Sequence, residues 1–117
     1  MKITTYKPDT WLVIKFTSPD DVTYKVFGGW YGGYANGDWW KLNSGIEHVE
    51  ENELFYLFHG YSGSVYECYK GSEKRLTMYH QGIISSFQES IYKAGEGYAM
   101  EIIESNSPEF VSLLKGL

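Results

Sequence analysis

Cysteine and arginine are nearly missing from this chain, and each scarcity excludes a class of structure or partner. Cys68 is the one cysteine in 117 residues, so no disulfide can form within the chain and a reducing compartment is favoured. Arg75 is the one arginine beside nine lysines, and the net charge is −5. Proteins that bind nucleic acid usually carry a basic stripe that neutralises phosphates. The sequence therefore predicts no nucleic-acid partner.

Long hydrophobic runs are missing as well. No apolar segment approaches the ~20 residues that a membrane-spanning helix needs. The first fourteen residues lack both the sustained apolar segment and the small-residue cleavage site of a signal peptide. We therefore expect a cytoplasmic protein with no membrane partner.

Catalytic, metal-binding and phosphate-binding motifs are not found either. The histidines His48, His59 and His80 form no His-x-x-x-His spacing, and the nearest two are eleven residues apart, so we expect ordinary surface or half-buried histidines and no metal site. Residues 60–64 lack the register of the G-x-S-x-G nucleophile turn. The glycines of residues 28–33 lack the dinucleotide and Walker patterns. The sequence predicts neither an enzyme nor a cofactor.

Aromatic residues and glycines are plentiful, and they favour short strands joined by tight turns. Aromatic residues make up 18% of the chain, with 13 glycines, and aromatic side chains suit the half-buried surface of a sheet. Asn36-Gly37, between aromatic runs, is typical of a type I′ hairpin turn. Apolar alternation and flanking turn residues predict strands at residues 11–17, 22–27, 46–49, 54–58, 64–69 and 98–103, besides the aromatic hairpin.

The period of the apolar residues changes after residue 77. Ile83, Phe87 and Ile91 recur every four residues, which predicts an amphipathic helix over residues 78–93 with Thr77 as its N-cap. Ser107-Pro108-Glu109 predicts the start of a second, short helix. The expected fold is one α+β domain over residues 1–117. It has an antiparallel sheet of about six to seven short strands, one amphipathic helix packed on that sheet and a short C-terminal helix.

The aromatic cluster is the strongest candidate for a ligand- or partner-binding site. Two interpretations stay open, a core rich in rings and a surface that binds another molecule, because Tyr and Trp dominate binding hot spots. Trp39 and Trp40 are adjacent in a predicted strand, so their rings must point to opposite faces of the sheet. The candidate residues are Trp30, Tyr31, Tyr34, Trp39, Trp40, Tyr61 and Tyr66.

Three short motifs resemble small orphan proteins encoded by tailed bacteriophages. The motifs are GWYGG at residues 29–33, LNSGI at residues 42–46 and SGSVY at residues 62–66, and the resemblance covers roughly residues 11–87. It implies synthesis in the cytoplasm of an infected bacterium and a role in host takeover or counter-defence. It supplies no catalytic residue.

Two hypotheses about function follow. In the first, the protein is not an enzyme and binds a host protein through an aromatic and acidic surface. In the second, an aromatic-lined pocket binds or sequesters a nucleotide-like molecule or a glycan. The single arginine provides few clamps for a multiply phosphorylated ligand, which favours the first hypothesis. The sequence leaves open whether the chain forms a homo-oligomer.

Overall fold

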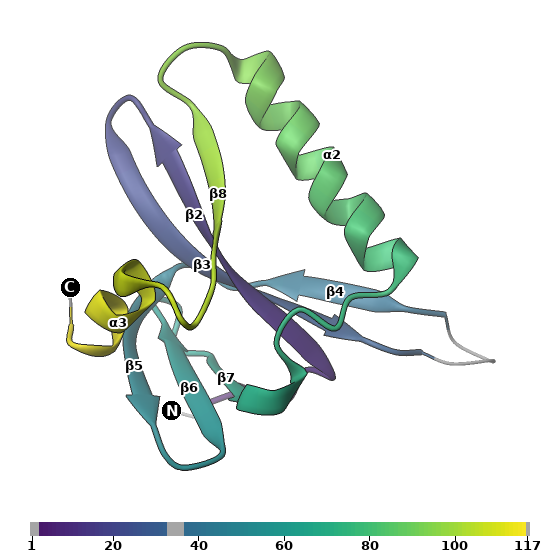
Figure 1. The fold of residues 1–117 in the computed structure, drawn as a ribbon, viewed down its shortest axis with the longest axis vertical. Helices are drawn as coiled ribbons and strands as arrows, with labels where there is room; N and C mark the ends of the chain where they lie inside the picture. The colour runs from purple at the N-terminus through teal and green to yellow at the C-terminus, as the bar shows by residue number, and fades with distance from the viewer. Residues whose placement is uncertain (1–2, 33–36, 117) are drawn as a thin grey trace.

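The computed structural model describes residues 3–32 and 37–116 (Figure 1). Within them, eight strands, one short 3₁₀ helix and two α-helices follow one another along the chain. In order, they are β1 (Thr5–Tyr6), β2 (Thr10–Ser18), β3 (Asp21–Trp30), β4 (Trp39–Leu42), β5 (Ile46–Glu51), β6 (Phe55–Gly60), β7 (Val65–Tyr69), η1 (Lys70–Ser72), α2 (Met78–Ala94), β8 (Ala99–Ile103) and α3 (Pro108–Leu114).

The strands form two four-stranded sheets, which confirms the α+β class and corrects the expectation of a single sheet. The first sheet has the order β1-β7-β6-β5 and the second has the order β4-β3-β2-β8. Every neighbouring pair is antiparallel except β1 with β7. The chain passes from the second sheet to the first between β4 and β5, where Gly45 has a φ of 132°. Glycine adopts such a conformation at little cost.

The main core lies between the two sheets and is built around Trp11. This indole is fully buried, and its Nε1 donates a hydrogen bond to the carbonyl of Tyr69 at 2.7 Å. The bond links a strand of the second sheet to a strand of the first. Cys68 is buried in the same core. The buried side chains of this core are Trp11, Val13, Val26, Ile46, Tyr56, Phe58, Tyr66, Cys68, Ile103, Phe110 and Leu113.

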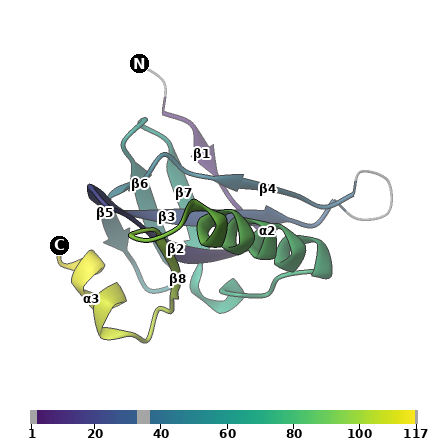
Figure 2. The same cartoon turned by 90° about the horizontal axis from the view of Figure 1, so that it is seen from above.

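The helix α2 covers the other face of the second sheet (Figure 2). It begins where the sequence predicts, with the Thr77 hydroxyl accepting a hydrogen bond from the His80 backbone N–H, and it ends at Gly95, whose φ is 97°. A second apolar cluster fills the space beneath the helix. Its buried members are Leu12, Ile14, Phe27 and Ile84, with half-buried Phe16, Trp40, Leu42, Leu76, Ile83, Phe87, Met100 and Ile102 around them.

The short helix α3 closes one end of the space between the sheets. Ser107 caps its first turn by accepting a hydrogen bond from the Phe110 N–H, and Pro108 occupies its start, both as the sequence predicts. Phe110 and Leu113 insert into the main core. Neither helix of the described residues is long and apolar enough to cross a bilayer.

Candidate functional site

The rings of Trp30 and Trp39 are stacked at the far end of the β3–β4 hairpin. The two residues are register partners, and their ring centroids lie 4.1 Å apart with the planes 6° from parallel. Trp30 packs against the main core, and its Nε1 donates a hydrogen bond to the Lys7 carbonyl at 3.1 Å. Trp39 lies on top of it and keeps 43% of its surface exposed. One indole therefore serves as a fixed base for a second, solvent-facing indole.

Tyr31, the residue after Trp30, presents a further exposed ring at this end of the hairpin, and its ring centroid lies 6.1 Å from that of His80. It is 45% exposed, and its hydroxyl donates a hydrogen bond to the Arg75 carbonyl at 2.5 Å. Its backbone N–H donates to Oδ2 of Asp9 at 2.9 Å, and the N–H of Gly32 donates to Oδ1 of Asp38 at 3.2 Å. Two carboxylates therefore hold the backbone where the strand ends. We call Trp30, Tyr31 and Trp39 the aromatic surface.

The other predicted site residues lie elsewhere. Trp40 points to the opposite face, as alternation requires, and stacks on Phe27 beneath α2 with centroids 5.7 Å apart. Tyr66 is buried in the main core. Tyr61 is exposed beside the first residues of β3, at the end opposite to Trp30. Tyr34 lies outside the described residues, as does Asn36 of the predicted turn.

His80, in the first turn of α2, contacts the backbone of the aromatic surface. The sequence did not predict this contact. The ring of His80 is fully buried, which corrects the expectation of a surface or half-buried histidine. Its Nε2 lies 3.0 Å from the carbonyl oxygen of Trp39. A side chain at Gly29 would force this ring to shift, since a Cβ there would lie 2.8 Å from Nε2 of His80. Glycine in a strand interior often marks such a close approach.

Two of the sequence motifs meet at a pocket of about 320 Å³. The hydroxyl of Ser44, in LNSGI, accepts a hydrogen bond from the backbone N–H of Ser62, in SGSVY, at 3.0 Å. Asn43 is buried, and its Oδ1 accepts from the Val26 N–H at 2.9 Å. Among the described residues, its Nδ2 has no hydrogen-bond partner. The pocket is lined by Tyr6, Lys41, Leu42, Asn43, Ser44, Ser62, Ser64 and Tyr66.

Burial disfavours ionisation of two groups in the main core that could otherwise act as nucleophiles. It raises the pKa of Tyr66 to about 12 and raises the pKa of Cys68 well above its usual value. Both groups remain protonated at neutral pH, and a protonated thiol is a poor nucleophile. Cys68 is therefore a structural residue in this fold.

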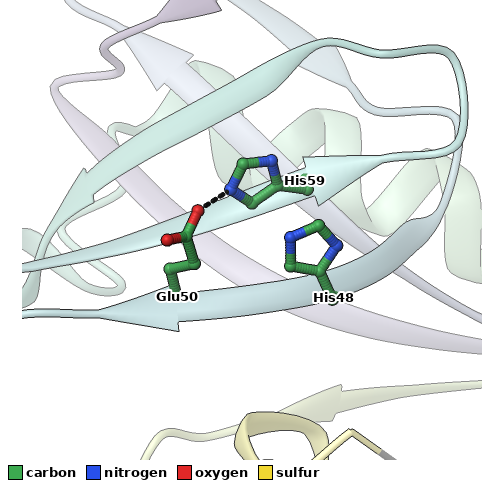
Figure 3. A group of neighbouring side chains, drawn as sticks. All are labelled: His48, Glu50 and His59. Atoms are coloured by element: carbon green, nitrogen blue, oxygen red, sulfur yellow. Dashed lines mark hydrogen bonds and ion pairs between the residues drawn. The ribbon is translucent and has the colours of Figure 1, made fainter.

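His48, Glu50 and His59 form a cluster on the β5–β6 hairpin (Figure 3). The separation of eleven residues fits no metal-binding motif, and the sequence predicted no metal site, but the strand register pairs His48 with His59. Their rings are stacked with centroids 4.1 Å apart, and Nε2 of His59 lies 2.5 Å from Oε1 of Glu50. One ligand atom from each of the three residues lies within 4.8 Å of the other two. Imidazole nitrogens and carboxylate oxygens are the ligand types of many transition-metal sites.

The motif resemblance receives no support from known proteins. Comparison of the chain with protein-family models, with curated proteins and with solved structures gives no match.

Proposed function

We propose that this protein is a non-enzymatic binding protein whose aromatic surface engages another protein. The observation that carries the proposal is the exposure of Trp39 while it is stacked on Trp30. Tryptophan and tyrosine are the side chains that most often dominate protein–protein interfaces. A flat indole held outward by a second indole offers a large apolar contact area to a partner.

The aromatic surface is organised before any partner arrives. Trp39 is positioned by its stacking partner, and Tyr31 by hydrogen bonds at both its backbone N–H and its hydroxyl. Each rotamer-rich side chain that must be immobilised on binding costs about 0.5–1.5 kcal/mol. Rings that are already fixed avoid most of this cost, which favours a binding role.

The nature of the partner follows from the motif resemblance alone. GWYGG at residues 29–33 is one of the three phage-like motifs, and Trp30 and Tyr31 of the aromatic surface belong to it. We propose that the partner is a protein of the bacterial host and that binding serves host takeover or counter-defence in the host cytoplasm. Asp9 and Asp38 give the surrounding surface its acidic groups.

Affinity capture from bacterial lysate tests the proposal, with the partner then purified and its dissociation constant measured. Trp39→Ala and Tyr31→Ala should each weaken binding by at least about tenfold, as expected for hot-spot residues. Tyr92→Ala is the matched control, because Tyr92 is an 87% exposed ring on α2, outside the aromatic surface. Equal affinity of Trp39→Ala and wild type for every captured protein would refute the proposal. Dimers that dissociate in Trp39→Ala would show that the partner is a second copy of this chain.

A second function is favoured by one observation. Among the residues that the structure describes, the buried Nδ2 of Asn43, at the pocket between the two motifs, has no hydrogen-bond partner. A buried amide donor that lacks a partner is costly unless a water or a ligand satisfies it. The pocket also offers serine hydroxyls and the ammonium of Lys41, which lies 5.3 Å from the Tyr6 ring centroid. These groups suit a nucleotide-like molecule or a glycan.

Thermal-shift screening against nucleotides and glycans tests this second function, because a ligand that binds only the folded state raises the melting temperature. A stabilising ligand should lose its effect in Ser62→Ala or Lys41→Met. It should keep its effect in Trp39→Ala, which separates the pocket from the aromatic surface. A library without any stabilising ligand would count against the pocket and leave the first proposal unaffected.

A further inference from the structure

We propose that His48, Glu50 and His59 bind a divalent transition-metal ion, with Zn²⁺ as the best-fitting ion. The three residues lie on the β5–β6 hairpin, and none of them belongs to the aromatic surface or lines the pocket at Asn43. The inference is independent of the proposed function. Figure 3 shows the three side chains on the same side of the hairpin.

A β-bulge brings the ligands to one face. Ile46 pairs with Gly60 and His48 pairs with His59, so β5 carries one extra residue, Glu47, at this point. Ile46 is buried in the main core, and strict alternation would therefore turn His48 inward as well. The bulge re-aims the strand so that His48 is exposed. Glu50 lies two residues further on and shares the face of His48.

The ligand atoms of the three residues would need to move only a short distance to reach a metal-bound geometry. Ligands of a tetrahedral Zn²⁺ ion lie about 3.3 Å apart, because each metal–ligand distance is about 2.0–2.1 Å. The three ligand atoms are now within 4.8 Å of one another, and His59 already contacts Glu50. The ring planes of His48 and His59 are 10° from parallel, so one ring must turn for both to address one ion. His48 has room to do so, since half of its side-chain surface is exposed.

The ligand types select the ion. Two imidazole nitrogens and one carboxylate oxygen suit Zn²⁺, Cu²⁺ or Ni²⁺, whereas Mg²⁺ and Ca²⁺ prefer oxygen ligands throughout. A second carboxylate, Oε1 of Glu47, lies 3.8 Å from Nδ1 of His48 and adds negative charge beside the site. Three protein ligands leave a fourth position open to water or to a group from a partner.

Titration of the purified chain with ZnCl₂, monitored by isothermal titration calorimetry, tests the site. Wild type should bind one Zn²⁺ ion per chain. His48→Ala, His59→Ala and Glu50→Gln should each weaken binding by at least about tenfold, since even residues that only orient metal ligands contribute that much. Glu51→Gln is the matched control, because it removes the same charge one residue along β5 from a side chain that pairs with Lys70 instead.

Three further outcomes decide between a specific site and none. Imidazole ¹⁵N shifts confined to His48 and His59 on Zn²⁺ addition, with His80 unchanged, would support the site. Equal Zn²⁺ affinity of wild type and a His48→Ala/His59→Ala double variant that keeps the wild-type circular dichroism spectrum would overturn it. Equal weakening by Glu51→Gln and Glu50→Gln would also overturn it, since only general negative charge would then attract the ion.

Discussion

The Nε2 atom of His80 lies 3.0 Å from the carbonyl oxygen of Trp39. A carbonyl oxygen only accepts hydrogen bonds, so this nitrogen carries the hydrogen and donates it. The other nitrogen, Nδ1, is then free to accept from the backbone N–H of Thr77 at 3.3 Å. One buried ring thereby links the strand of the aromatic surface to the first turn of α2.

Replacing His80 with alanine should destabilise the protein by about 2–4 kcal/mol. The loss combines a cavity with two backbone groups, at Trp39 and Thr77, that lose their buried partner. Urea unfolding followed by circular dichroism measures this change as a lower midpoint. His48→Ala, at an exposed position, should stay within about 0.5 kcal/mol of wild type. Equal midpoints for the two variants would show that His80 does not hold α2 to the hairpin.

Two glycine-to-alanine substitutions should have opposite effects. A Cβ at Gly29 would meet the ring of His80 at 2.8 Å and the Cγ2 of Thr10 at 3.0 Å, and both neighbours are fully buried. We expect Gly29→Ala to cost about 1–3 kcal/mol, as overpacking does. Gly82 lies inside α2 with open space around it, so Gly82→Ala should stabilise the helix by about 0.5–1 kcal/mol. Thermal unfolding of both variants checks the pair, and shifts of the same sign would contradict this account.

Alanine substitution of the adjacent residues Trp39 and Trp40 should lower the free energy of unfolding to different extents. Trp40→Ala removes a ring stacked on Phe27 and packed against Phe87, and we expect a loss of about 2–4 kcal/mol. Trp39→Ala removes an exposed ring, and its stacking with Trp30 is worth about 0.5–1.5 kcal/mol. Chemical unfolding of both variants compares these losses. A larger loss for Trp39 than for Trp40 would mean that the aromatic surface is part of the folding core.

Local signals explain which elements the sequence predicts well. Thr77 and Gly95 bound α2, and Ser107 and Pro108 begin α3, because caps act within one helical turn. The opposite directions of Trp39 and Trp40 follow from the period of a strand. Which of the two rings is exposed depends on the distant helix α2, and no short-range pattern encodes that.

The division into two sheets and the histidine cluster depend on contacts between distant residues. Alternation in β4 and β5 marks two strands, but it does not show that the chain changes sheets at Gly45. The spacing of eleven residues between His48 and His59 matches no metal-binding motif, yet both residues are equally distant from the middle of the β5–β6 turn. Assuming a hairpin centred on that turn would have been enough to predict that His48 pairs with His59. The one-residue bulge at Glu47 would still have escaped notice.

Glu109 should make the folded state sensitive to acid. The hydrogen bond from Lys15, at 2.8 Å, and then that from Tyr24 hold the pKa of the Glu109 carboxyl below its usual value of 4.5. A carboxyl whose pKa is lower in the folded state stabilises the fold above its unfolded pKa, and this stabilisation is lost as the pH falls through the folded pKa. The contacts join α3 to strands β2 and β3, so their loss should loosen the C-terminal helix.

Glu109→Gln removes the titrating group and keeps the shape of the side chain. Wild type should exceed this variant in free energy of unfolding at pH 7, and the difference should shrink as the pH falls below 4.5 towards 3, because the protonated carboxyl of wild type then resembles the amide. Urea unfolding across this pH range measures the difference, and the comparison isolates Glu109 because all other carboxyls are common to both proteins. When both proteins also carry Lys15→Met, the pH-dependent part of their difference in free energy of unfolding should become smaller. The hydrogen bond from Lys15, which is the largest cause of the pKa shift of Glu109, is then gone. A difference that stays constant from pH 7 to pH 3 would mean that Glu109 holds α3 through its shape and neutral hydrogen bonds, and that its charge does not contribute.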